Sequence, residues 1–213
     1  MKKVILLGGG GHAKCVIDAM AEGGVYVPAG VLDLKERVGE KVLDVSITGT
    51  DADLPACHKR GVKLCVVTLG STGDPARRMA LWKKAEAAGF DFPNIIHPAA
   101  IVSRHAKLGR GIYIGPGAIV NAGAVIGDGC IINSGAIVEH DCRIGDFAHI
   151  APGAALSGGV TVGDRAHLGT SCAVSHGVKI GPDTVLGAGS VAVKDLPARA
   201  VCVGVPAKKI KGK

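Results

Sequence analysis

The chain has 213 residues, 33 of them glycine, with only 3% aromatic residues and a net charge of +7. This length can hold one large domain or two modest ones, but the few aromatic side chains argue against an ordinary β-sandwich core and favour a narrow prism filled by aliphatic residues. No apolar run approaches the ~18 residues of a membrane span, and basic residues do not alternate with aromatic ones, so we expect neither a membrane span nor a nucleic-acid partner.

The N-terminus begins like an export signal, because two lysines precede the apolar residues 4–7. Four glycines and a polar helix follow, and no cleavage-site pattern is present. We therefore interpret residues 4–7 as the first β-strand of a cytoplasmic protein.

A glycine-rich loop from Gly8 to Gly11 separates this strand from a helical pattern over residues 12–20. A strand, a glycine loop and a helix together offer backbone N–H groups to a phosphate. The loop matches the dinucleotide fingerprint G-x-G-x-x-A from Gly8 to Ala13. The chain has no room for a second βαβ half, so a mononucleotide or a nucleotide sugar is the better ligand. His12 could meet a phosphate, although a histidine without a ligand fits the spacing equally well.

Two more strands and a helix are predicted before the repeats begin. The strand at residues 27–32 ends at Asp33, where the fingerprint expects an acid for a ribose hydroxyl. The strand at residues 64–68 is followed by a loop whose Gly70 is a candidate substrate-binding residue, and residues 75–89 read as a helix. Alternating strands and helices predict a small Rossmann-like α/β domain over residues 1–95.

A six-residue repeat organises the rest of the chain. Every sixth residue from Val102 to Leu186 is a branched aliphatic, and the residue four positions later is nearly always small. This period fits neither a helix nor a two-residue strand alternation, but it fits a solenoid of short strands. Three hexads make one coil of eighteen residues, and coils stack at roughly 4.8 Å. We expect a parallel β-helix over residues 96–213, with its register ending after Leu186 and a C-terminal cap.

The segment Glu139-His140-Asp141 stands out from this lattice, because the neighbouring coils have only small or amide residues at the same positions. A histidine flanked by carboxylates is a plausible general base, and a charged surface turn is the simpler alternative. His149 lies nine residues later, which is half a coil. The two histidines then leave opposite sides of one prism and can share a site only between two chains, which predicts a homotrimer.

Two further histidines follow the eighteen-residue period. His167 should stack on His149, and His176 lies two coils above His140. Either could line a ligand groove, although a solvated surface position is the simpler expectation for both.

Cysteine chemistry is not expected. The seven cysteines form no CxxC pair. Cys130, Cys142 and Cys172 occupy the small inward position of the hexad, where cysteine acts as a small hydrophobe.

The repeat resembles the left-handed β-helix of the hexapeptide acyltransferases, and the ending G-A-G-S-V…G-V-P-A-K is typical of them. With the N-terminal V-I-L-L-G-G-G-G-H-A-K, the whole chain resembles the family of sialic-acid O-acetyltransferases and bacterial nucleotide-aminosugar N-acetyltransferases. Its second branch includes the enzymes that make N-acetylated bacillosamine and perosamine. The resemblance implies transfer of acetyl from acetyl-CoA to an amino group, typically at C4 of a UDP-, GDP- or dTDP-linked sugar. It also implies a trimer with sites between subunits and no metal.

The resemblance also assigns roles to residues. It makes His140 the catalytic base with Asp141 as its orienting acid, and Glu139 belongs to the same motif. It associates His149 with the acetyl-CoA carbonyl, and Thr170 and Ala188 with the CoA groove. It places the remaining matches at the nucleotide sugar or near the base: Gly10, Gly11, His12, Asp33 and Asn133. Leu34 departs from relatives that have two adjacent acids, so the nucleotide or sugar preference can differ.

Four other functions are alternatives to this one. O-acetylation of a sialic or related nonulosonic acid uses the same donor and base. An NAD-type oxidoreductase leaves the whole repeat unexplained, and a non-catalytic scaffold leaves His140 unexplained. A metal site like that of the γ-class carbonic anhydrases needs three histidines across a subunit seam, and the histidine spacing fits it less well.

Overall fold

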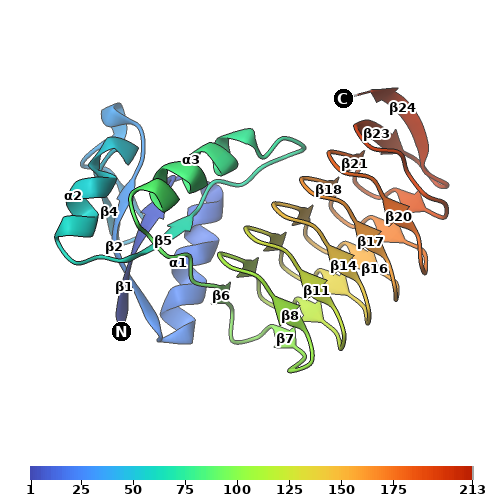
Figure 1. The fold of residues 1–213 in the computed structure, drawn as a ribbon, viewed down its shortest axis with the longest axis horizontal. Helices are drawn as coiled ribbons and strands as arrows, with labels where there is room; N and C mark the ends of the chain where they lie inside the picture. Colours follow the sequence, from blue (N-terminus) through green and yellow to red (C-terminus); the bar gives the residue numbers. More distant parts are fainter. Residues whose placement is uncertain (213) are drawn as a thin grey trace. The chain divides into compact units, whose positions relative to one another are not determined.

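A computed structural model describes residues 1–212 of the chain (Figure 1). The chain divides into two compact units. One comprises Met1–Ser71 and Pro75–Pro98, here called the α/β unit, and the other comprises residues 72–74 and the chain from Ala99 onward, here called the repeat unit. No helix within residues 1–212 is long and apolar enough to cross a membrane.

The α/β unit is built on a five-stranded sheet in the order β3-β4-β2-β1-β5. β1, β2, β4 and β5 are parallel, and β3 pairs with β4 as an antiparallel hairpin. The strands are β1 (Lys2–Leu7), β2 (Tyr26–Leu32), β3 (Lys41–Val42), β4 (Val45–Gly49) and β5 (Leu64–Val67). The helical segments and one further short strand are α1 (Gly11–Gly23), η1 (Lys35–Arg37), η2 (Asp51–Asp53), α2 (Leu54–Lys59), α3 (Ala76–Ala87) and β6 (Ile95–Ile96).

The predicted strands β1, β2 and β5 and the helices α1 and α3 are confirmed. Helix α1 buries Ala13, Val16, Ile17 and Met20 at helical spacing, and it ends at Gly24, whose φ of 64° suits glycine. The hairpin of β3 and β4 and the helix α2 were missed. The hairpin turns at Leu43 (φ 54°) and Asp44, without the Asn-Gly or Asp-Gly pair that marks such a turn in sequence.

The repeat unit is a parallel β-helix with three strand faces (Figure 1). Successive strands from β7 to β22 on each face pair with a register of eighteen residues, as in Ile119↔Ile137 and His149↔His167, whereas β21 pairs with β23 as Val185↔Val201 and β24 is antiparallel to β23. The first face holds β7 (Ile101–Val102), β10 (Ile119–Val120), β13 (Ile137–Val138), β16 (Ala155–Leu156), β19 (Ala173–Val174) and β22 (Val191–Ala192). The second holds β8 (Lys107–Leu108), β11 (Val125–Ile126), β14 (Arg143–Ile144), β17 (Thr161–Val162) and β20 (Lys179–Ile180). The third holds β9 (Tyr113–Ile114), β12 (Ile131–Ile132), β15 (His149–Ile150), β18 (His167–Leu168), β21 (Val185–Leu186), β23 (Ala200–Val203) and β24 (Lys208–Gly212).

The hexad pattern accounts for the core of this unit. The aliphatic positions from Ile114 to Leu186 and the small residues that follow them are buried, and Cys130, Cys142 and Cys172 are buried without forming disulfides. The predicted end of the register after Leu186 is wrong by one hexad. Ala192 continues the series in β22 and is fully buried, and the pattern missed it because alanine replaces the branched residue.

The outward aspartates on one corner of the prism have a structural role. Asp128, Asp146 and Asp164 each accept a backbone N–H from the coil below, at 2.8 to 3.0 Å. Because parallel coils leave corner N–H groups without a ladder partner, these carboxylates complete the backbone hydrogen bonding. Acidic residues are therefore a regular part of this corner.

Candidate active site

His140 lies in the turn after β13, and its ring contacts Asp141. The Nδ1 atom lies 2.9 Å from Asp141 Oδ2. Glu139 instead accepts the backbone N–H of His140, at 3.2 Å. Asp141, with its backbone at φ 61°, is therefore the acid that orients the ring. Aspartate is among the few residues other than glycine that tolerate this conformation.

The electrostatics of this pair suit a general base. The hydrogen bond to Asp141 raises the pKa of His140, and the charges of Asp141 and Glu139 act in the same direction. A neutral ring that donates from Nδ1 to a carboxylate has its lone pair on Nε2. The side chain is 57% exposed, so Nε2 is placed to accept a proton from a bound molecule.

His149 is buried on the third face, in a different environment. Its Nε2 lies 3.2 Å from Asn133 Nδ2, and Asn133 Oδ1 accepts the Ser134 N–H at 2.9 Å, which fixes the orientation of the amide. Nε2 therefore accepts, and the ring proton is on Nδ1. Asn133, expected near the base His140, contacts His149 through this hydrogen bond.

His167 stacks on His149, as its spacing predicted. The rings meet edge to face with 4.9 Å between their centroids. The expectation that His167 is solvated is wrong, because only 8% of the residue is exposed. Paired strands place successive side chains directly above one another, and the two rings therefore cover each other.

The candidate CoA contacts lie at the same side of the prism as His149. Thr170 and Ala188 follow β18 and β21, one coil apart and both exposed. The Thr170 carbonyl accepts the Gly189 N–H at 2.9 Å. His140 instead follows β13 on the first face, so the chain carries the two sets of candidate residues on different faces.

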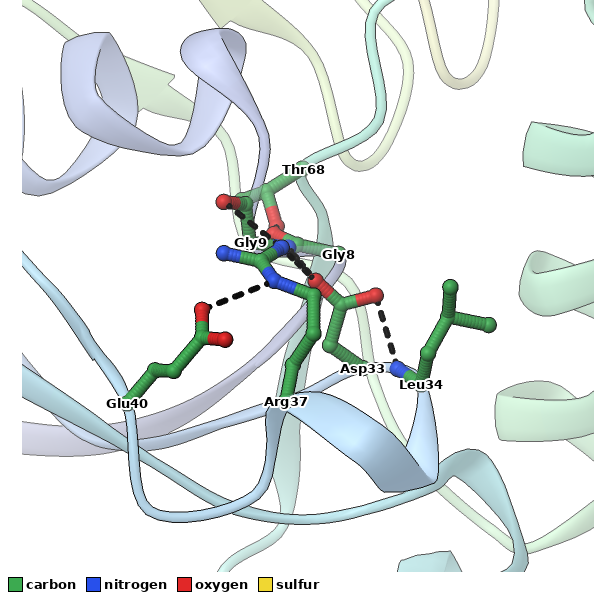
Figure 2. Close-up of polar contacts among 7 residues, drawn as sticks. All are labelled: Gly8, Gly9, Asp33, Leu34, Arg37, Glu40 and Thr68. Carbon is green, nitrogen blue, oxygen red and sulfur yellow. Dashed lines mark hydrogen bonds and ion pairs between the residues drawn. The ribbon is translucent and has the colours of Figure 1, made fainter.

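The glycine loop is braced by an ion-pair network that the sequence did not reveal (Figure 2). Asp33 Oδ2 accepts the Gly9 N–H at 2.8 Å and lies 2.5 Å from Arg37 Nη1. Arg37 also donates to the Gly9 carbonyl at 3.2 Å and to Glu40 at 3.0 Å. Thr68 donates its hydroxyl to the Gly8 carbonyl at 2.5 Å. Asp33, expected to meet a ribose hydroxyl, thus also holds the loop in shape.

The middle of the glycine loop is open. A Cβ atom on Gly10 or Gly11 would meet no atom within 4 Å, and Gly10 caps α1 without a side-chain hydrogen bond. No side chain at these two positions therefore blocks the approach of a ligand to the N-terminus of α1. Gly70 lies beside His12, because its Cβ would be 3.6 Å from that of His12. Burial, together with the charge of Arg78, lowers the pKa of His12 to about 4, so its ring is neutral at pH 7.

A hollow of about 360 Å³ adjoins the glycine loop. It lies at the carboxyl ends of β1 and β2, where open parallel sheets bind ligands. Its walls combine apolar and charged side chains: Gly8, Leu32, Asp33, Leu34, Asp51, Leu69, Arg77, Ala80, Leu81 and Lys84. A larger hollow of about 750 Å³, which includes Lys3 and Pro28, lies toward the other end of the same strands. The smaller hollow is the candidate nucleotide site, because Gly8 of the glycine loop and Asp33 line it.

Residues 1–212 contain no group of three or more histidine, cysteine, aspartate or glutamate side chains placed to hold a metal ion. His140 lies near His176 and His149 near His167, with 6.5 Å and 4.9 Å between the ring centroids.

Comparisons with known proteins match both units. The PglD N-terminal domain family matches residues 3–84, and the bacterial transferase hexapeptide family matches residues 123–158. No curated protein matched the chain.

Solved structures match over the whole length. PerB from Caulobacter crescentus, in complex with CoA and GDP-perosamine, is 43% identical with a TM-score of 0.93, over 99% of this chain and 98% of that one. The acetyltransferase domain of PglB from Neisseria gonorrhoeae, in complex with acetyl coenzyme A, is 34% identical with a TM-score of 0.89, over 98% and 99%. WeeI from Acinetobacter baumannii shares the fold at 20% identity and a TM-score of 0.85, over 99% and 100%.

The fold and the repeats are those of a hexapeptide-repeat transferase, and the predicted α/β domain followed by a left-handed β-helix is confirmed. The chain belongs to the acetyl-CoA-dependent sugar N-acetyltransferases that join a PglD-type N-terminal domain to these repeats.

Proposed function

We propose that the protein transfers the acetyl group of acetyl-CoA to the C4 amino group of a nucleotide-linked amino-deoxy sugar. The His140–Asp141 pair carries this proposal, because it presents an oriented base with an open Nε2 atom. The relative from C. crescentus, which holds CoA and GDP-perosamine, makes a GDP-linked sugar the first candidate.

The proposed reaction transfers the acetyl group in one step from CoA to the sugar, without an acyl-enzyme. The sugar amine attacks the thioester carbonyl, a C–N bond forms and the C–S bond breaks. His140 Nε2 takes the proton from the amine and returns it to the departing CoA sulfur, while Asp141 holds the imidazolium. His149 donates its Nδ1–H to the developing oxyanion. Thr170 and Ala188 contact CoA.

The α/β unit is proposed to bind the nucleotide. The pyrophosphate meets the N–H groups at Gly10 and Gly11 and the neutral ring of His12, with Gly70 beside them. The nucleobase and the ribose of the substrate occupy the hollow next to Asp33. We also propose a cytoplasmic location, because residues 4–7, which resemble an export signal, form the buried strand β1.

The active protein is proposed to be a homotrimer with its sites between subunits. His140 and His149 follow different faces of one chain, so one catalytic set needs His140 of one subunit and His149 of the next. The flat faces of the prism allow three-fold packing.

An acetyl-CoA/DTNB assay tests the function directly. UDP-, GDP- and dTDP-linked 4-amino sugars are compared with free sialic acid as acceptors. We expect CoA release with at least one amino sugar and none with sialic acid. Release with sialic acid alone would replace the proposal with O-acetylation.

Replacing His140 by alanine tests the base. We expect kcat to fall roughly 10²–10⁴-fold with little change in fold, because general base catalysis contributes this much. Structures of the C. crescentus enzyme with one histidine replaced by asparagine or alanine still hold CoA and GDP-perosamine, and we expect His140→Ala to bind both ligands too. His105→Ala, at an exposed histidine of the repeat unit, is the control. Activity within twofold of the parent would refute the assignment.

A further inference from the structure

Gly158 lies directly next to His140 in the stacked coils. Ala122, His140, Gly158 and His176 follow one another at eighteen-residue intervals, and we call them the His140 column. The Gly159 N–H donates to the His140 carbonyl at 2.9 Å, and the Gly177 N–H donates to the Gly158 carbonyl at 3.0 Å. These bonds hold successive corners of the column in register.

The backbone does not explain why residue 158 is a glycine. Five nearby turn glycines have φ between 64° and 76°, a conformation that favours glycine: Gly123, Gly135, Gly153, Gly159 and Gly177. Gly158 is not among the positive-φ residues, so an alanine could adopt its backbone conformation without strain.

The ring of His140 explains why residue 158 is a glycine. A Cβ atom at residue 158 would lie 2.5 Å from both Cε1 and Nε2 of His140, and 3.1 Å from Cδ2. These are the three nearest atoms to that position, and the first two distances are far inside van der Waals contact. The ring therefore occupies the space that a side chain at residue 158 would take.

His176 bounds this space from the next coil. Two coils are separated by roughly 9.6 Å, yet the ring centroids of His140 and His176 are 6.5 Å apart, with a 45° tilt. The two rings can converge because the residue between them has no side chain. Two features therefore position the His140 ring. Asp141 bonds its Nδ1 atom, and the space next to Gly158 accommodates the edge that carries Nε2.

We propose that Gly158 is a positioning residue for His140. Because Gly158 has no side chain, it leaves a space, here called the seat, that the ring occupies. In this position the ring keeps its bond to Asp141 and its Nε2 atom stays uncovered. This role rests on the function proposed for His140. A side chain at residue 158 would turn the ring away from Asp141 and also cover the nitrogen that takes the proton.

Gly158→Ala tests the seat in the full-length protein. We expect kcat to fall at least tenfold, with the KM for acetyl-CoA within twofold of the parent. The acid limb of the pH–rate profile should move to lower pH, because a ring that loses Asp141 also loses the bond that raises its pKa. A purely structural defect would reduce the amount of active enzyme without moving this limb. Gly23 also has an ordinary φ, and its Cβ would meet no atom within 4 Å. The control variant Gly23→Ala should therefore leave kcat and the acid limb unchanged.

A stability cycle tests the contact without any activity. Gly158→Ala should lower Tm in the parent but much less in a His140→Ala background, because the clash is then removed. If Gly158→Ala alone does not fold, the double variant should fold. NMR titration of the His140 ring should show a lower pKa in Gly158→Ala. An unchanged acid limb with kcat within twofold, or an equal loss of stability in both backgrounds, would overturn the proposal. The NMR and stability results decide it even if no sugar is acetylated.

Discussion

Specific side-chain contacts distinguish the acids that surround each candidate site. Two acids flank His140, and only Asp141 reaches its ring. Asp33 is likewise one acid among several near the glycine loop, but it alone bonds both Gly9 and Arg37. Distances of this kind distinguish a residue that orients a catalytic group from a neighbour that contributes only charge.

The pH dependence of the reaction should follow the His140–Asp141 bond. A base must be deprotonated, so activity falls as the pH drops through the raised pKa of His140. Asp141→Asn removes the cause of the rise, and we expect the acid limb to move to lower pH while kcat falls by roughly one to two orders of magnitude. Glu139→Gln should move the limb less, because Glu139 acts on the ring only through its charge. Equal shifts in the two variants would contradict the assigned role of Asp141.

Arg37 should affect binding of the nucleotide sugar and leave the chemical step unchanged. Arg37→Ala frees Asp33 and the Gly9 carbonyl, so the glycine loop loses its brace. We expect the KM for the nucleotide sugar to rise roughly tenfold, since hydrogen bonds to charged groups contribute about 1.5–3 kcal/mol. Steady-state kinetics should show unchanged kcat and unchanged KM for acetyl-CoA. Lys35→Ala, on an exposed side chain of the same turn, is the matched control, and a fall in kcat would argue against the brace.

The short strands of the repeat are stable only as a stack. Each strand from β7 to β22 has two residues, far too few for independent stability, and its inward aliphatic residue packs against those of the adjacent coils. The six-residue pattern predicted this arrangement because the requirement is local and repeats in every hexad. It could not predict β3 and β4, whose pairing depends on a single hairpin.

One inward residue should therefore be costly to remove. Ile126 in β11 is 1% exposed, and Ile126→Ala is expected to destabilise the protein by about 2–5 kcal/mol through lost burial and the cavity left behind. Urea unfolding at fixed protein concentration measures this as a lower midpoint. Val193→Ala, at a side chain that is 48% exposed, should change stability by less than about 0.5 kcal/mol. Similar losses in both variants would show that the hexad does not define the core.

At the scale of the whole molecule, the important feature is that one chain separates its candidate catalytic residues. His140 follows β13 on the first face, whereas His149 lies in β15 on the third. A trimer brings such residues together only if a neighbouring chain supplies the second one. In the proposed trimer, catalysis is therefore a property of the assembly.

Mixing inactive variants tests this division. His140→Ala and His149→Ala should each be poorly active, but random trimers formed from equal amounts of the two should recover about a quarter of the activity. Three quarters of such trimers are mixed, and each mixed trimer has one intact seam out of three. Light scattering should give a mass near three times the 21.4 kDa of one chain. No recovery in trimers shown to be mixed would place the site within one chain.

The sequence by itself determined the β-helix, the glycine loop with its helix, and His140 as an outward residue that breaks the pattern. Each of these follows from local spacing, because a hexad or a strand–loop–helix unit imposes its requirement on neighbouring residues. Only the tertiary structure decided that Asp141 contacts the ring of His140, that Arg37 braces Asp33, that Asn133 contacts His149, and that the His140 ring lies against Gly158. These contacts join residues through the direction of side chains and the stacking of coils, which spacing alone does not specify.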